Sequence, residues 1–546
     1  GRITRGATDG LGHNTYGFTG DGTIISGGGH GFLTAYNKEG QKTASFIGHT
    51  GDVWGIAIDG DTLVSGSDDQ TIKLWNLKEL KIGSGYKPEP AKEIYPMLNI
   101  FVSKDDEWVV WSNKGYYNAS VGGDKYIGYH INQGPDKEAI FYRVDKFSKT
   151  YYRPDIIKNI IRLGSEEKAL EYVKSEKKVE EVRVAEILPP LIRLNKPEST
   201  SLTTTNDSIV VDFTVIPQSK HEITETAILV NGRPIGDRGM AVTPKDGVIR
   251  VVKDVPLNEQ FNRISLIARN RYASSEEVMI EVEKKVKASG DTKVSGDMYK
   301  PNLYILAIGV SQYQNNDLNI KYAADDARAL VEMFKGQEGR LFKTVKYKLF
   351  LNAETTRDTI LDGIDWLDKE ATQRDVVVLF IAGHGVNDDK DNYYFLSYEA
   401  NLDKLRSTAV RWTDFEDIVT TLPSKTILLA DTCHAGGIMG KRRMIDNNIT
   451  KAIKELISSG RGQVIMTAST GGSASFEEDA WGHGAFTKAI LEGLGELKAD
   501  FDKNNVITVK EIDLYVTNRV KELTSGRQKP TTIIPESVPD FPIVSR

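Results

Sequence analysis

The chain has 546 residues, which is too many for a single hydrophobic core and predicts about three or four domains. Hydrophobic residues make up 39% and charged residues 27%, as in ordinary globular proteins. The formal net charge of -6 does not indicate the excess of basic residues that nucleic-acid binding requires, so we expect no nucleic-acid partner. No run of about eighteen apolar residues occurs, so we expect no membrane span. The residues after Gly1 resemble neither a signal peptide nor a transit peptide, and we expect the chain to be a fragment or processed product.

Cys433 is the only cysteine of the chain. A single thiol cannot form an internal disulfide, so the composition favours a cytoplasmic location. A free cysteine is usually an inert, small apolar side chain. The role of Cys433 therefore depends on the residues around it.

The first eighty residues are rich in glycine and in short apolar runs that predict β-strands, and the domain that they begin is expected to end at residue 112. Gly48-His49 precedes three such runs, and the last of them ends in Trp75-Asn76. This pattern resembles a WD-repeat propeller blade, with Asn76 where the family usually has aspartate. A weaker copy precedes it, and a diverged third unit comes after it at residues 99–103 and 107–112. Two or three blades cannot close a ring, so we expect further blades upstream of Gly1.

Three further segments separate these blades from the C-terminal part. Residues 113–186 form an aromatic connector followed by a charged helix. Residues 187–283 alternate apolar and polar positions, which predicts an immunoglobulin-like β-sandwich with a tight hairpin at Asn231-Gly232. Residues 284–300 form a polar linker. We expect the blades and the sandwich to bind a protein partner.

Residues 301–546 alternate apolar runs with amphipathic helices, which predicts an α/β domain with a mainly parallel sheet. The expected strands are 303–310, 376–381, 393–398, 426–430 and 464–468. The expected helices are 323–335, 356–371, 413–422, 449–459, 484–497 and 509–523. Thr355 and Asp358 fit a capping box for the second helix.

Two motifs come directly after strands of this predicted sheet. Ala382-Gly383-His384-Gly385 ends one strand, and Asp431-Thr432-Cys433-His434-Ala435-Gly436 ends another. Open α/β sheets place their active sites at the carboxyl ends of their strands. His384 and Cys433 are 49 residues apart in sequence, a separation typical of caspase catalytic residues.

These residues resemble the caspase-like (clan CD) cysteine peptidases, most closely the metacaspase and bacterial orthocaspase branch. Asp431 to Gly436 resembles the Asp-Ser-Cys-His-Ser-Gly motif of metacaspases. The segments Ala307–Tyr313, Ala323–Ala327 and Gly482–Thr487 are similar to that branch as well. The resemblance implies a cysteine endopeptidase that requires no cofactor.

In such an enzyme His384 would favour the Cys433 thiolate and later protonate the leaving amine. The resemblance implies an oxyanion hole made by the amides of Gly385 and Cys433. His434 is the competing base by adjacency. Neighbouring side chains of a strand point apart, which favours His384.

Asp431 lies two residues before Cys433, so a strand would place both side chains on one side. The resemblance implies that Asp431 lines a pocket for an arginine or lysine before the cut bond. Glu477 and Glu478 are further candidates for this pocket. Asp431 could instead only brace its loop. The two alternatives to a basic-specific peptidase are an Asp- or Asn-selective enzyme and a catalytically silent scaffold.

Two other segments carry candidate sites. Lys441-Arg442-Arg443 lies shortly after the catalytic strand and is a candidate for self-cleavage. Asp500, Asp502, Asn504 and Glu511 have the spacing of a calcium-binding EF-hand loop, although Asn505 replaces its glycine. The alternative is a turn that caps the helix after it. The sequence leaves open the natural substrate, the activating signal, the oligomeric state and any need for calcium.

Overall fold

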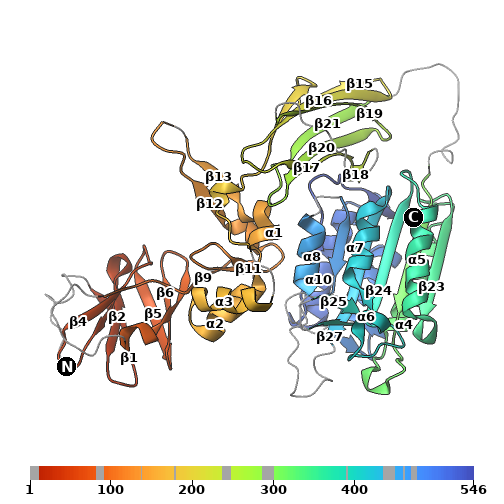
Figure 1. Ribbon diagram of the computed structural model, residues 1–546. Helices are drawn as coiled ribbons and strands as arrows, with labels where there is room; N and C mark the ends of the chain where they lie inside the picture. Colours follow the sequence, from red (N-terminus) through yellow and green to blue (C-terminus); the bar gives the residue numbers. More distant parts are fainter. Residues whose placement is uncertain are drawn as a thin grey trace. The chain divides into compact units, whose positions relative to one another are not determined.

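The computed structural model divides the chain into two compact units, Gly1–Leu188 and Pro189–Arg546, each described here by itself (Figure 1). The residues that it describes are 12–81, 92–136, 138–176, 180–235, 247–285, 300–388, 392–434, 449–458, 462–468 and 476–546. Among these residues no helix combines the length and the apolar composition that crossing a bilayer requires.

The first unit contains two antiparallel sheets that share an apolar core around Trp75. One sheet has the order β1-β2-β3-β4-β8, where only β4 and β8 run parallel. Its strands are β1 (His13–Phe18), β2 (Ile24–Gly28), β3 (Leu33–Tyr36), β4 (Lys42–Phe46) and β8 (Lys92–Ile94). The other has the order β11-β10-β9-β7-β6-β5. Its strands are β5 (Val53–Asp59), β6 (Thr62–Ser67), β7 (Ile72–Asn76), β9 (Leu98–Val102), β10 (Trp108–Trp111) and β11 (Tyr117–Ala119).

The expected third blade does not form a sheet of its own within the described residues. Strand β9 pairs with β7, with Ile100 opposite Ile72, and β10 and β11 continue the same ladder. The reason is that the exposed edge of β7 offers unpaired backbone groups, which β9 satisfies. Residues 99–112 therefore extend the second sheet.

A buried hydrogen-bonded chain ties the second sheet together. The imidazole of His49 is 2.8 Å from Asp69 through Nδ1 and 2.8 Å from the Ser65 hydroxyl through Nε2. The indole of Trp75 donates to the same hydroxyl over 2.8 Å. The Gly-His and tryptophan of the motif are therefore partners in one network, and each buried polar group in it is satisfied.

Acidification is expected to weaken this network. Burial lowers the pKa of His49 below its ordinary value of 6.5, against the opposing pull of Asp69. The unfolded chain therefore takes up a proton near pH 6.5 while the folded chain does not, and stability falls as the pH drops below that value. The loss is at most about 1.4 kcal/mol per pH unit. Urea midpoints followed between pH 7.5 and 5.5 measure it.

The control is the exposed His30. His49→Gln should remove part of the pH dependence, whereas His30→Gln should leave it unchanged. If the free energy of unfolding fell equally with pH in the wild type and in His49→Gln, His49 would not be the group responsible.

Asn76 connects the second sheet to the helices that come after it. Its amide donates to the carbonyl of Gly164 over 2.7 Å, and Gly164 has the left-handed φ of 68° that ends helix α2. A carboxylate at position 76 could not donate this bond. The departure from the usual aspartate thus has a local reason. The elements here are β12 (Gly128–Ile131), β13 (Ile140–Arg143), α1 (Ser148–Tyr151), α2 (Pro154–Leu163) and α3 (Glu166–Glu176).

The second unit begins with two sheets that enclose one apolar core, as the period-two pattern predicts. The sheet β14-β16-β19 consists of β14 (Leu191–Lys196), β16 (Ser208–Ile216) and β19 (Ile249–Pro256). The sheet β15-β21-β20-β17-β18 consists of β15 (Ser201–Thr204), β21 (Val278–Lys284), β20 (Phe261–Asn270), β17 (Ile223–Val230) and β18 (Arg233–Pro234). The tight turn at Asn231-Gly232 is confirmed, since both residues have positive φ and Val230 pairs with Arg233.

That hairpin packs closely against the C-terminal domain. A Cβ atom on Gly232 would lie 2.7 Å from the Cα of Gly462, and the Gly462 amide donates to the Gly232 carbonyl over 2.9 Å. Beside it Glu259 accepts from Arg233 and, over 2.9 Å, from Lys425 at the start of β27. Burial alone would raise the pKa of Glu259, but the two cations hold it below its ordinary value.

The C-terminal domain is built on a mixed sheet of order β23-β22-β24-β27-β28-β32, in which β25 pairs with β24 and β26 with β25. All pairs from β23 to β28 along this order are parallel, which confirms the predicted arrangement. The strands are β22 (Leu303–Gly309), β23 (Val345–Leu351), β24 (Val376–Asn387), β25 (Tyr393–Phe395), β26 (Val410–Arg411), β27 (Lys425–His434), β28 (Val464–Thr467) and β32 (Thr531–Ile533). Short ladders join β29 (Glu477–Glu478) to β30 (His483–Gly484) and β31 (Val506–Thr508) to β33 (Pro542–Ser545).

Helices cover both faces of this sheet. The helices α4 (Ala323–Lys335), α9 (Ala485–Ile490) and α10 (Val509–Leu523) share the core with Leu303, Ile305 and Ala307 of β22. Gly363 of α5 packs instead against Leu306, which points to the opposite face. The remaining helices are α5 (Arg357–Glu370), α6 (Leu405–Thr408), α7 (Trp412–Thr421) and α8 (Ile449–Ser458).

The expected bounds of α5, α7 and α8 differ from the structure by one residue at one end or both, and two predictions differ further. Thr356, not Thr355, caps α5, because its hydroxyl accepts from the amide of Thr359 while Thr355 is buried. The helix expected over 484–497 starts as α9 but widens to a π-helical turn at Leu491–Gly495. Helices α4 and α10 have the predicted bounds.

Candidate active site

The two motif-bearing strands, β24 and β27, are parallel neighbours in the centre of the sheet. The register places Val376 opposite Lys425, and the ladder continues without a shift until His384 lies opposite Cys433. Two residues that are 49 positions apart in sequence are thus adjacent across one strand pair.

The imidazole of His384 is held by the loop after β22. Its Nε2 lies 2.9 Å from the carbonyl oxygen of Leu318, its backbone amide donates to the Tyr313 hydroxyl over 2.9 Å, and its ring stacks on that of Tyr313. The side chain is almost fully buried, with 2% of the residue exposed. Because a carbonyl oxygen only accepts, Nε2 carries the hydrogen, and Nδ1 is the basic nitrogen of the neutral ring.

The glycines on either side of His384 are required by packing. Gly383 has a φ of 153°, which L side chains rarely adopt, and a Cβ there would lie 3.0 Å from the Tyr313 hydroxyl oxygen. A Cβ on Gly385 would lie 1.9 Å from the hydroxyl oxygen of Tyr393, which donates to Thr432 of β27 over 2.9 Å. The Gly-His-Gly sequence therefore lets two tyrosines close around the histidine.

Asp431 belongs to a buried group of acidic side chains. It is 5% exposed and accepts from the hydroxyl of Thr487 in α9 over 3.1 Å. Asp326, in the first turn of α4, is 2% exposed and lies 2.6 Å from Nδ1 of His483. A Cβ on Gly484 would lie 3.0 Å from Asp431 and 3.2 Å from Asp326, so both carboxylates reach the same backbone position.

Of the two glutamates, the structure brings only Glu477 to this group. Glu477 accepts from the amide of Lys321 over 3.2 Å, whereas the next residue, Glu478, is exposed, as alternation along β29 requires. Burial raises the pKa of Glu477, and the nearby Asp326 adds to the effect. Burial also raises the pKa of Asp326. We refer to Asp326, Asp431 and Glu477 as the acid cluster.

The other predicted sites have different outcomes. Lys441, Arg442 and Arg443 lie outside the described residues. Carboxylate oxygens of Asp500, Asp502 and Glu511 lie within 4.8 Å of one another, and Asn504 is bonded to Asp502. The capping alternative is confirmed, because Thr508 and Glu511 form a capping box at the start of α10. Calcium binding by this loop stays a prediction.

The sequence did not single out Tyr313, Leu318, Asp326, His483 or Thr487 as site residues. Tyr313 and Leu318 lie in the loop after β22, the strand next to β24, so their position at a strand end is a signal that was available. Asp326 is one of two adjacent aspartates, Asp325 and Asp326, and only burial separates their roles.

Two segments of the chain match models of known protein families. Residues 303–537 match the family model of the caspase domain. The C-terminal part of the chain is therefore similar to the caspase domain. Residues 40–76 match the model of the WD domain, G-beta repeat, which confirms one predicted blade.

Two further comparisons add no function. One similar solved structure is the crystal structure of protein GSU0716 from Geobacter sulfurreducens, with 14% sequence identity and a TM-score of 0.32. The match covers 45% of this chain and 99% of that chain. None of the curated proteins matches.

Proposed function

We propose that this protein is a cysteine endopeptidase in which Cys433 is the nucleophile and His384 the general base. The observation that carries the proposal is the register of His384 opposite Cys433 at the ends of two parallel strands. The hydrogen bond from His384 Nε2 to Leu318 supports it, since it leaves Nδ1 as the nitrogen that can take a proton.

In the proposed reaction the Cys433 thiol gives its proton to His384, and the sulfur attacks the peptide carbonyl carbon. The oxyanion that forms would accept from the amides of Gly385 and Cys433. The imidazolium then protonates the leaving amine as the C–N bond breaks. Water, deprotonated by His384, attacks the thioester and releases the acid and the free thiol.

We propose that the residue before the cut bond is arginine or lysine. The acid cluster supports this choice, because it puts carboxylates of three different segments together in a largely buried region. Burial raises the pKa values of Asp326 and Glu477, repulsion from neighbouring carboxylates adds to both shifts, and a bound guanidinium or ammonium would relieve both effects. Asp431 joins the cluster to the cysteine, as it is two residues earlier on β27.

Replacing Asp431 or Asp326 by asparagine should therefore lower kcat/KM on arginine and lysine peptides by about 10²-fold, the usual effect of leaving a buried charge unpaired. A fluorogenic peptide panel with Arg, Lys, Asp and Asn before the reporter measures the effect.

The matched control is Glu478→Gln, which removes the same charge from an exposed position. It should change kcat/KM by less than about twofold. Wild-type cleavage after Asp or Asn would favour the alternative specificity. A folded wild type that cleaves no peptide would favour a silent scaffold.

Self-cleavage is a further expectation of this specificity. Lys441-Arg442-Arg443 would meet the active site at high effective concentration, because the segment belongs to the same chain. We expect a cut after one of these residues that leaves a C-terminal piece of about a hundred residues. Intact mass of the wild type beside Cys433→Ala checks it. An active wild type that stays uncut through many turnovers would show that this segment is not a substrate.

We further assign the enzyme to the metacaspase and orthocaspase branch, on the motif around Cys433, and to a bacterial source. A single thiol favours a reducing compartment, so we propose a cytoplasmic location. The blades and the two-sheet module, which we take to be immunoglobulin-like, would bind a protein partner that regulates cleavage. We propose no nucleic-acid partner and no required cofactor.

A further inference from the structure

A cavity of about 680 Å³ opens at the ends of α4 and α9 that are remote from the acid cluster. Helix α4 begins near Asp326 and reaches the cavity with Met333, and the π turn that continues α9 reaches it with Leu491 and Leu494. The third wall is the end of β33. The volume lies within the range of small-molecule sites.

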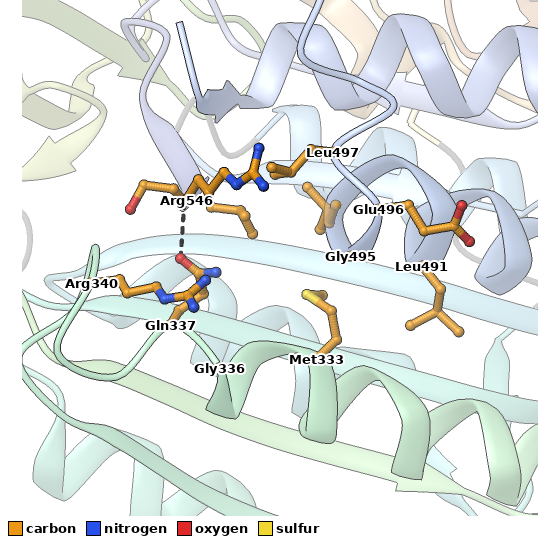
Figure 2. Close-up of a pocket in the computed structure, with 12 residues that line it drawn as sticks. Met333, Gly336, Gln337, Arg340, Leu491, Gly495, Glu496, Leu497 and Arg546 are labelled. Atoms are coloured by element: carbon orange, nitrogen blue, oxygen red, sulfur yellow. Dashed lines mark hydrogen bonds between the residues drawn. The ribbon is translucent and has the colours of Figure 1, made fainter. Parts of the chain in front are cut away.

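The cavity has an apolar part and a cationic part. Figure 2 shows the side chains of Arg340 and Gln337 together on one side and Leu491 on the other, with the guanidinium end of Arg546 beside Leu497. The apolar lining is completed by Leu494, Leu497 and Val544. Such a division matches a ligand that is charged at one end and apolar along the rest.

Two cationic side chains, Arg340 and Arg546, line one end of the cavity. Within the described part of the chain neither Arg340 nor Arg546 forms an ion pair. The acidic residue of the lining, Glu496, is neutralised by Lys498 at 2.8 Å. Gln337 is engaged as well, since its side-chain oxygen accepts from the amide of Ser545 over 2.9 Å. The two guanidinium groups therefore place hydrogen-bond donors and positive charge at one end of the cavity.

The backbone of the wall is unusual at two nearby places. Leu491–Gly495 is a π-helical turn, a form that occurs often at functional sites. Leu497 has a φ of 57°, the left-handed region that a branched apolar residue rarely adopts. Residues in such conformations cost free energy and cluster at ligand sites. Both features direct leucine side chains to the cavity.

We propose that this cavity binds a small anionic amphiphile, with a carboxylate or phosphate head on Arg340 and Arg546 and an apolar chain over Met333, Leu491 and Leu497. The arginine fork suits either head group, because it donates two parallel hydrogen bonds to a planar or tetrahedral oxyanion. The proposal does not depend on peptidase activity.

Calorimetric titration of the full chain with decanoate and with decyl phosphate tests the proposal. One molecule per chain should bind, and the tighter probe identifies the head group. Decylammonium, with the same chain length and the opposite charge, should not bind. Arg340→Glu should weaken binding at least about tenfold, as loss of a charge-assisted hydrogen bond does. Leu497→Gly, which suits the positive φ, should weaken it while the protein stays folded.

The matched control is Arg406→Glu, the same charge change at an exposed position on α6 outside the cavity. It should leave the affinity unchanged. Absence of saturable binding would overturn the proposal, and so would equal affinity for decylammonium. Equal weakening by Arg340→Glu and Arg406→Glu would overturn it too, since only the overall charge would then matter.

Discussion

Replacing Cys433 by alanine is expected to reduce peptide hydrolysis by at least about 10³-fold, because no other side chain can form the thioester. Cys433 is the only thiol of the chain, so iodoacetamide should label one site and inactivate the wild type in parallel. Initial rates on an arginine peptide, together with the mass of the labelled chain, measure both effects. If Cys433→Ala still hydrolysed the peptide near the wild-type rate, Cys433 would not be the nucleophile.

A matched pair of histidine variants tests the base. His384 and His434 lie near the ends of adjacent strands, and His434 is next to the cysteine in sequence. His384→Ala should lose activity to about the same extent as Cys433→Ala, since the two act as a unit. His434→Ala should keep most of it. The opposite result would assign the base to His434. Circular dichroism should show the folded state in all three variants.

Replacing Glu259 by alanine is expected to lower the free energy of unfolding of the second unit by about 3 kcal/mol. Arg233 and Lys425 are 5% and 14% exposed, and Glu259 is their shared carboxylate. Without it two buried cations face each other with no counter-charge. Among the described residues Arg233 would then keep neutral acceptors such as the carbonyl of Gln373. Urea unfolding followed by circular dichroism measures the loss.

Glu281→Ala is the control for this variant. Glu281 pairs with Arg263 over 2.9 Å on the same module, but it is 61% exposed. An exposed ion pair contributes at most about 1 kcal/mol. If both variants lower the free energy of unfolding equally, water reaches the contact that Glu259 makes between the two-sheet module and β27. The double variant Glu259→Ala with Lys425→Met should recover part of the loss, because one unpaired charge is removed.

The sequence alone was informative wherever the decisive interactions are local. Helices α4 and α10 could be predicted to the residue because amphipathic periodicity and, for α10, a capping box at Thr508 act within a few positions. The same holds for the hairpin at Asn231-Gly232, where two adjacent residues supply the positive φ. The sequence-based prediction of the cap was wrong at α5, where either of two successive threonines could cap the helix.

The candidate catalytic pair was found from the sequence, because each motif comes directly after a long apolar strand and parallel strands end at the same edge of the sheet. The acid cluster shows the limit of this reasoning. Asp326, Asp431 and Glu477 come from three segments; the sequence analysis proposed Asp431 and Glu477 for one pocket but gave no sign that Asp326 joins them. Glu477 and Glu478 are chemically identical neighbours, and only the pairing of β29 with β30 buries one and exposes the other.

Local propensity and periodicity thus predicted most strands and helices, the WD-like repeat and the two strand-end motifs, but they missed β23, β32 and α6 of the C-terminal domain. Tertiary packing alone decided that residues 99–112 extend the second sheet and that Leu318 orients His384. It also decided that Asp326 joins Asp431. The physical reason is that these contacts join residues far apart in sequence. Their energies depend on burial and on hydrogen-bond partners that exist only once the sheets have formed.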